Sequence, residues 1–285
     1  MRDTLSNLVF RLLVGIAMAL PYRARVRFFG WVVAHLIGPI AGYGRRVRTN
    51  LALIHPEMSP REVRGLTRAV CDNIGRTLIE TYSGAEFKRR AAASPTRGEG
   101  FAAVEAAQRS GRAVVFVSGH FGNYDVLRSW LGARGQAVGA LYRPFPNMHF
   151  DAHYRAAIAA ISDPIFPRGR RGLAEMLQHV RQGGMVGMLI DQHKESGAVL
   201  RFLGHPAKTA TSAAEMAIKY DALLLPFYGV RQPDGLSFEL VIEGPIPPGT
   251  PEEMTQALND SLERQVRAHI GQWFWITRRW RVGAR

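Results

Sequence analysis

A regular alternation of short apolar segments and longer amphipathic segments after residue 60 constrains the fold more than any other feature. Residues 113–117 (AVVFV) are apolar without interruption, which is typical of a strand buried on both faces of a sheet. Similar runs at residues 137–141, 185–190 and 223–230 predict three more strands. This alternation predicts an α/β fold in which helices flank a central sheet.

The predicted helices fill the intervals between these strands. A first helix begins at Pro60, and further helices are expected at residues 101–110, 124–133, 149–161, 171–182, 212–220 and 252–270. Residues 236–242 alternate in polarity, which predicts an edge or antiparallel strand and makes the central sheet mixed. Residues 94–100 are expected to form a loop. Because no repeat or linker divides this part, we expect one α/β domain over residues 45–285.

The first 44 residues differ from the remainder in composition. Residues 8–20 and 28–41 are apolar runs, each shorter than the ~20 residues that a straight membrane span needs. The pattern predicts helices that lie in an anionic bilayer interface and serve as a membrane anchor. Helices packed on the protein's own core are the alternative. The basic residues that flank the two runs are Arg2, Arg23, Arg25, Arg27, Arg45, Arg46 and Arg48.

The net charge of +14 indicates an anionic partner or surface. Acidic phospholipid, an acidic carrier protein and nucleic acid are the candidates. Arginine supplies nearly all of the positive charge, and its planar fork matches phosphate and carboxylate groups; a GC-rich genome would produce the same bias. No segment resembles an RNA-recognition aromatic motif or a helix-turn-helix, so we expect no nucleic-acid partner. A basic membrane- or nucleic-acid-binding protein without catalysis is the non-enzymatic alternative.

Cysteine and histidine usage gives no indication of a disulfide or a metal. Cys71 is the only cysteine, which excludes an intrachain disulfide and favours a buried thiol. His149 and His153 are four residues apart, but the glutamate of the zinc-protease motif is missing. We therefore expect neither a metal nor a cofactor.

The turn that follows the first core strand is the best candidate for a catalytic centre. His120 comes directly after this strand and Asp125 five residues later, with Asn123 between them as a candidate helix cap and substrate-binding residue. A carboxylate beside an imidazole orients the ring and stabilises its protonated form. That pair suits a general base acting on an alcohol. A helix-capping contact without chemistry is the alternative.

Further polar residues follow the other predicted strands and would reach the same edge of the sheet. Arg143 precedes a proline and could bind an acceptor phosphate, with a surface salt bridge as the alternative. Arg168, Arg170 and Arg171 crowd one predicted loop, where their mutual repulsion favours a bound phosphate. Asp191 follows the strand at residues 185–190. Its expected role is to orient the substrate, to support the histidine, or to stabilise the fold.

Several segments resemble one known family. Residues 119–125 (GHFGNYD) resemble the histidine–four residues–acid motif of the bacterial lipid A late acyltransferases, the lauroyl/myristoyl transferase family. Residues 142–144 (YRP), 202–211 (FLGHPAKTAT) and 275–280 (WITRRW) resemble further segments of that family in the same order. The resemblance therefore covers nearly the whole chain.

The resemblance implies an α/β fold like that of the glycerol-phosphate acyltransferases, with His120 as the base and Asp125 as its partner. It implies an acyl carrier protein thioester as donor and a phosphorylated lipid acceptor. It also implies a catalytic domain on the cytoplasmic side of the inner membrane. Lipid A enzymes commonly carry glutamate at the position of Asp125, and aspartate resembles the mycobacterial phosphatidylinositol mannoside acyltransferases. The expected acceptor is a lipid A precursor, with another membrane glycolipid or phospholipid as the alternative.

Overall fold

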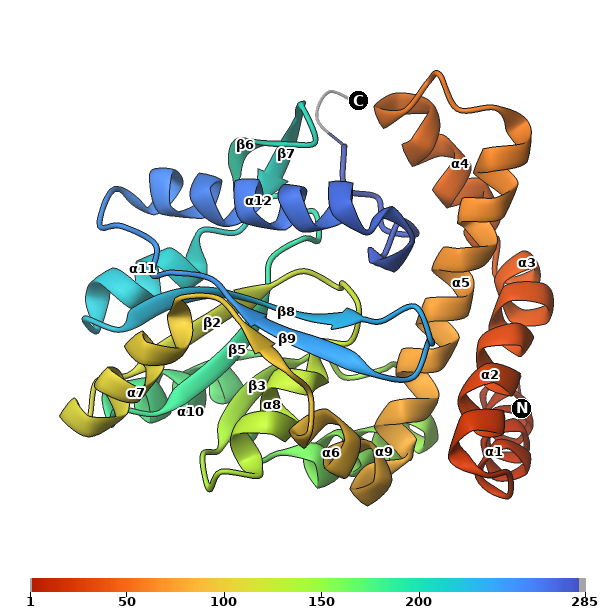
Figure 1. The fold of residues 1–285 in the computed structure, drawn as a ribbon, viewed down its shortest axis with the longest axis horizontal. Helices are drawn as coiled ribbons and strands as arrows, with labels where there is room; N and C mark the ends of the chain where they lie inside the picture. Colours follow the sequence, from red (N-terminus) through yellow and green to blue (C-terminus); the bar gives the residue numbers. More distant parts are fainter. Residues whose placement is uncertain (1, 282–285) are drawn as a thin grey trace.

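A seven-stranded sheet forms the centre of the computed structural model, which describes residues 2–281 and the side chains of residues 7–281 (Figure 1). The strand order is β1-β9-β8-β2-β5-β3-β4. A separate hairpin contains β6 (Ala198–Phe202) and β7 (His205–Thr209). The sheet strands are β1 (Thr96–Arg97), β2 (Val114–Ser118), β3 (Val138–Tyr142), β4 (Ile165–Pro167), β5 (Met185–Leu189), β8 (Leu223–Arg231) and β9 (Phe238–Ile242).

The sheet is mixed, as the alternation at residues 236–242 predicts. Strands β8, β2, β5, β3 and β4 are parallel, β9 is antiparallel to β8, and β1 is parallel to β9. The expectation of a loop over residues 94–100 is wrong at β1. The sequence analysis also missed β4 and the β6–β7 hairpin. β1 and β4 have only two and three residues. The hairpin strands are mostly half-buried or exposed, so none of these strands forms a long apolar run.

Helices cover both faces of this sheet. Val114 and Phe116 of β2 belong to a core cluster with residues of α5 to α9, whereas Val115 and Val117 pack with α10, α11 and α12. Both faces of β2 are therefore buried, which explains its uninterrupted apolar sequence. The helices are α1 (Arg2–Met18), α2 (Tyr22–Val32), α3 (Gly38–Ile40), α4 (Tyr43–Ile54), α5 (Pro60–Tyr82), α6 (Gly84–Ala92), α7 (Gly100–Ser110), α8 (Asp125–Gly132), α9 (Met148–Ile161), α10 (Arg170–Arg181), α11 (Ser212–Lys219) and α12 (Pro251–Ala268).

The N-terminal helices pack on the domain with one side and expose apolar side chains on the other. Val26 and Phe29 of α2 are buried in the same core cluster as the sheet. Gly75 allows α5 to approach α2, because a Cβ atom there would lie 2.6 Å from the Phe29 carbonyl oxygen. Large apolar side chains exposed on α1 to α3 are Leu8, Val9, Leu12, Ile16, Met18, Trp31 and Ile40.

No single helix within residues 2–281 is long and apolar enough to cross a membrane. One bent pair, Tyr22–Ile40 with Tyr43–Ile54, passes the same test of length and composition across a bend of 86°. The structure therefore supports the predicted helices at the N-terminus and leaves their membrane contact as a prediction.

We predict that Phe29→Ala lowers the free energy of unfolding by about 3–5 kcal/mol, because it leaves a cavity between α2 and α5 where the ring is fully buried. Trp31→Ala on the exposed side of α2 is the matched control and should change stability by less than about 0.5 kcal/mol. Denaturant titration in detergent measures both. Equal losses for the two variants would show that α2 is not a part of the core.

Candidate active site

His120 and Asp191 meet where two neighbouring parallel strands end. His120 lies two residues after β2, and Asp191 lies two residues after β5. The register pairs Ser118 with Leu189, and the Ile190 amide donates to the Ser118 carbonyl oxygen at 3.1 Å. This pairing brings together two side chains that are 71 residues apart in the sequence.

The carboxylate of Asp191 is fully buried and accepts three hydrogen bonds. Its Oδ1 accepts from Nδ1 of His120 at 2.7 Å. Its Oδ2 accepts from the His120 amide at 2.8 Å and from Nε1 of Trp273 at 2.9 Å. Burial alone would raise the pKa of Asp191, but the charge of His120 and these hydrogen bonds together hold that pKa below its usual value. Asp191 is therefore ionised at neutral pH and fixes the orientation of the imidazole ring.

The other ring nitrogen of His120, Nε2, is available for proton transfer. The side chain is 21% exposed, and no residue in the described part of the chain forms a hydrogen bond with Nε2. Phe274 stacks on the ring at 5.3 Å between centroids, and Tyr124 contacts it edge-on at 5.7 Å. The arrangement holds a tautomer with its proton on Nδ1, so Nε2 can accept a proton from a hydroxyl group.

Asp125 does not pair with His120, contrary to the prediction from sequence. Its Oδ1 accepts from Nη1 of Arg128 at 2.8 Å, and both side chains are about 95% buried. Arg128 also donates to the carbonyl oxygens of Ile158 and Ser162 and so ties α8 to α9. Asp125 is only 4% exposed, so its carboxylate is a buried group. A position in the first turn of α8 directs this carboxylate into the core.

Asn123 is also a buried residue of the turn rather than an exposed contact for substrate. Its side-chain oxygen accepts a hydrogen bond from the Asp125 amide at 3.0 Å. Asp125 is the first residue of α8, so this bond resembles the helix cap that the sequence predicts. Its Nδ2 donates to Glu80 at 2.8 Å, and its amide donates to the Gly229 carbonyl oxygen at 2.9 Å. Asn123 is fully buried and therefore holds the catalytic turn against α5 and β8.

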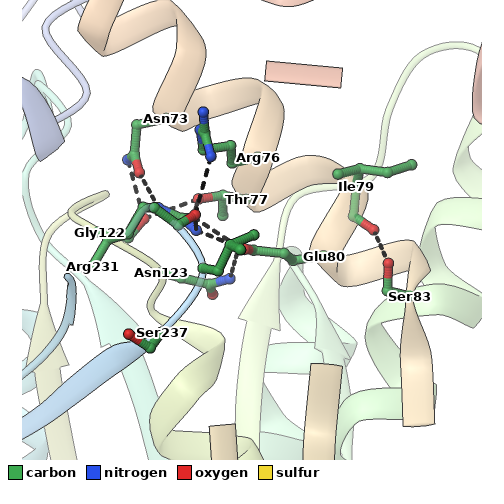
Figure 2. A network of polar contacts seen from close by, with 12 residues as sticks. Asn73, Arg76, Thr77, Ile79, Glu80, Ser83, Gly122, Asn123, Arg231 and Ser237 are labelled. Atoms are coloured by element: carbon green, nitrogen blue, oxygen red, sulfur yellow. Dashed lines mark hydrogen bonds and ion pairs between the residues drawn. The ribbon is translucent and has the colours of Figure 1, made fainter. Parts of the chain in front are cut away.

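A buried ion pair lies behind this turn (Figure 2). The guanidinium of Arg231 on β8 contacts both carboxylate oxygens of Glu80 on α5, at 2.6 and 2.7 Å. Arg231 also donates to Asn73 at 2.7 Å, while Asn73 and Thr77 both donate to the Gly122 carbonyl oxygen. Glu80 is fully buried and Arg231 is 7% exposed. The network fixes the backbone next to His120 without contacting the imidazole.

Gly122 meets a steric requirement of the same turn. Its φ angle is +53°, a left-handed conformation that favours glycine. A Cβ atom there would lie 2.0 Å from the Gly229 carbonyl oxygen on β8. The turn can therefore approach β8 this closely only with glycine at this position.

We predict that Glu80→Gln destabilises the fold by about 3–5 kcal/mol, because it leaves the buried charge of Arg231 without a partner. The double variant Glu80→Gln/Arg231→Met should lose less than the sum of the two single changes. Urea unfolding of all three variants measures this coupling. Additive losses would show that the two side chains do not act as a pair.

The arginines predicted to bind phosphate lie at the same edge of the sheet. Arg143 follows β3 and Arg168 follows β4, and the Arg168 amide donates to the Tyr142 carbonyl oxygen at 2.7 Å. Both side chains are exposed, and neither has an ion-pair partner within residues 2–281. Arg170 and Arg171 begin α10 rather than belonging to a loop, and Arg171 pairs with Glu175 at 2.9 Å. Arg143 and Arg168 are therefore better placed than Arg171 to bind an anion.

The C-terminal segment supplies residues that the sequence analysis missed. Trp273 donates to Asp191, and the Phe274 amide donates to the His120 carbonyl oxygen at 2.9 Å. Further along, Arg279 is fully buried and donates to Lys208 and Thr209 of β7. Burial lowers the pKa of Arg279 to about 10. The tryptophans and arginines after residue 270 mark this segment in the sequence as a candidate part of the site. Their spacing along the chain does not show which residues they contact.

The histidines considered as metal ligands have other surroundings. His153 contacts the Tyr82 hydroxyl group at 2.8 Å and Asn7 at 3.0 Å. His149 is exposed. Within the described residues, no group of three or more His, Cys, Asp and Glu side chains could hold a metal ion.

Comparisons with known proteins find a matching family model and related acyltransferases. The family model described as "Bacterial lipid A biosynthesis acyltransferase" matches residues 3–282. The chain is 27% identical over 242 residues to the lipid A biosynthesis lauroyltransferase of Escherichia coli K12, covering 83% of this chain and 78% of that protein. It is 23% identical over 181 residues to a phosphatidylinositol mannoside acyltransferase of Mycobacterium tuberculosis, covering 62% of this chain and 57% of that protein.

Proposed function

The chain belongs to the bacterial lipid A biosynthesis acyltransferase family, and from that premise we propose that it transfers a fatty acyl chain from an acyl carrier protein thioester to a hydroxyl group of a lipid A precursor. The chain is an acyltransferase by family and by relatives. The observation that carries the mechanism is the pair of His120 and Asp191 at the carboxyl edge of the sheet.

The reaction needs one general base and no covalent enzyme intermediate. Nε2 of His120 removes the proton of the acceptor hydroxyl group as its oxygen attacks the thioester carbonyl carbon. An ester C–O bond forms, the C–S bond breaks, and the proton passes from His120 to the departing thiolate. Asp191 stays ionised and stabilises the imidazolium that exists between the two transfers. Asp191 takes the role that the sequence analysis gave to Asp125.

Arg143 and Arg168 are the groups that we propose to bind a phosphate of the acceptor. Their exposed guanidinium groups follow β3 and β4, on the edge that carries His120 after β2. β3 is two strands from β2 in the sheet. The backbone of Arg143 therefore lies roughly 10 Å from the backbone of His120. An acceptor that carries its phosphate and its hydroxyl group on one sugar headgroup can span such a distance.

The mycobacterial relative supports a second acceptor, a phosphatidylinositol mannoside or another membrane glycolipid. The two acceptors differ in headgroup and in the position of the phosphate, whereas the proposed chemistry at His120 is the same. Mass spectrometry of the products formed from each acceptor, with one acyl carrier protein thioester as donor, decides between them. Acylation of the mannoside alone would contradict the lipid A assignment.

We predict that His120→Ala and Asp191→Asn each lower turnover by about 10²–10⁴-fold. Since the pKa of Asp191 is lowered in the folded state, ionised Asp191 stabilises the fold above pH ~4, and this contribution is lost only as the pH falls below that range. Steady-state rates across pH measure both variants.

Asp125→Asn is the matched control for this series. It should lower the free energy of unfolding by about 3–5 kcal/mol, because Arg128 remains as an uncompensated buried charge. The folded fraction should keep a turnover close to that of the wild type, because Asp125 does not contact His120. Lost turnover in folded Asp125→Asn and wild-type turnover in Asp191→Asn would assign the partner of His120 to Asp125 instead.

We propose further that residues 1–44 place the enzyme on the cytoplasmic surface of the inner membrane, with the α/β domain formed by residues 45–285. The exposed apolar side chains of α1 to α3 support this proposal, as does the lipid in the name of the Escherichia coli relative. The other side of the same helices packs on the core of the domain. Removal of the whole segment would therefore also destabilise the fold, so point variants on the exposed side are the better test.

We predict that Leu12→Glu/Ile16→Glu markedly reduces co-sedimentation with membranes while the melting temperature in detergent changes by at most a few degrees. Both side chains are exposed, so the change removes apolar surface from the bilayer and leaves the core intact. Ala102→Glu/Ala106→Glu on the exposed side of α7, away from the N-terminal helices, is a control of equal charge. Full membrane binding by the first variant would exclude α1 as the contact surface.

A further inference from the structure

Two basic pockets adjoin at the bend between α3 and α4, away from His120 in the sequence and with no role in the proposed transfer. The first has a volume of about 500 Å³ and is lined by arginines from α4 and from the C-terminal segment: Arg45, Arg46, Arg278 and Arg281. The second, of about 360 Å³, is lined by arginines of α4 and α5: Arg45, Arg48, Arg64 and Arg68. Gly42 and Arg45 belong to both pockets.

The charge of these pockets is not compensated by the protein. No acidic side chain lines either pocket, and within residues 2–281 none of their seven arginines forms an ion pair. Exposed arginines elsewhere do find carboxylates, as Arg97 does with Glu239 and Arg112 with Asp221. Seven like charges around two adjoining hollows repel one another, so an anion that binds there relieves the repulsion.

The walls of the first pocket are held rigidly. Asn50 of α4 is 8% exposed, and its Nδ2 donates to the carbonyl oxygens of Trp275 and Thr277, each at 2.7 Å. These bonds fix the C-terminal segment against α4 across more than 220 residues of sequence. The backbone that carries Arg278 is therefore fixed beside α4, and Thr277, which also lines this pocket, has a buried hydroxyl group without a hydrogen-bond partner among the described residues.

The neighbouring surface indicates the source of the anion. Trp31, Leu36 and Ile40 are 51%, 47% and 88% exposed, and Ile40 directly precedes Ala41 and Gly42 in the pocket wall. Figure 1 shows α3 and α4 on the side of the molecule that also carries α1 and α2. A lipid that binds with its acyl chains along the apolar side chains brings its headgroup phosphate to the arginines. A membrane lipid carries acyl chains and an anionic headgroup in one molecule, so it matches both the apolar side chains and the arginines.

We propose that this pair of pockets binds the phosphate group of a membrane lipid headgroup, at a site separate from the acyl-transfer centre. Arginine is suited to this ligand because its planar fork forms two parallel hydrogen bonds with phosphate oxygens. The first turn of α4 begins at Tyr43 beside both pockets, and Gly42 gives it no side-chain cap, so its positive dipole end adds to the attraction. The site would orient the enzyme on the bilayer surface. The proposal rests on the membrane association proposed above and does not depend on the transfer reaction.

The test is flotation of the full-length protein on vesicles of a phosphate-free glycolipid, digalactosyldiacylglycerol. One set contains phosphatidic acid and the other contains oleic acid adjusted to the same surface charge. The pocket variant is Arg45→Gln/Arg278→Gln. The control variant is Arg109→Gln/Arg181→Gln, which removes the same charge from the exposed last turns of α7 and α10. All four arginines are exposed, so both variants should keep the wild-type melting temperature.

We expect wild type and the control variant to bind phosphatidate vesicles at least tenfold more tightly than oleate vesicles, and the pocket variant to lose this difference. Acyl transfer to a detergent-solubilised acceptor should persist in both variants, which separates this site from the function proposed for His120. Equal binding of wild type to the two vesicles would overturn phosphate recognition. Full competition by millimolar inorganic phosphate without any vesicle preference would overturn the lipid source. If the pocket variant lost binding to the acyl carrier protein but kept the wild-type preference for phosphatidate vesicles, the ligand of the pockets would be the carrier protein and not a lipid.

Discussion

The hydrogen bonds of the buried Asp191 carboxylate are the interactions on which the candidate active site depends. A carboxylate without solvent contact must be compensated by hydrogen-bond donors, and its three donors come from His120 and Trp273. Three distant parts of the chain are thereby joined: the end of β2, the end of β5 and the C-terminal segment. The same bonds that satisfy the carboxylate fix the imidazole ring, so the stability of this region and its chemistry have one physical cause.

The Glu80–Arg231 pair constrains the same turn from the opposite side. Asp191 holds the His120 amide and ring, whereas Glu80 and its neighbours hold Gly122 and Asn123. A second buried pair, Asp125 with Arg128, joins the following helix to α9. Three buried carboxylates therefore surround a turn of a few residues. Such an arrangement is costly to desolvate and gives little net stability, but it leaves the backbone around His120 with few alternatives.

Two sets of exposed arginines lie on the surface of the protein. Arg143 and Arg168 lie at the carboxyl edge of the sheet, while another set of arginines surrounds the bend before α4. The exposed side chain of Ile40 on α3 directly precedes residues that line the pockets of the second set. These two sets of arginines contribute to the net charge of +14. We propose the first set for binding the acceptor and the second for binding the membrane surface.

The sequence by itself determined the α/β class, the mixed sheet, the main helices and the turn that carries His120, because apolar periodicity reports directly which faces are buried. The sequence placed Asp191 at the carboxyl edge of the sheet but left its role open. It assigned Asp125 as the partner of His120 because the two residues are close in the chain. Only the tertiary structure decided which carboxylate binds His120. The register of β5 on β2 brings Asp191 to His120 across 71 residues, and the first turn of α8 sends Asp125 into the core toward Arg128. Spacing along the chain carries no information about strand register or about which buried charge a carboxylate meets, and those two facts fixed the site.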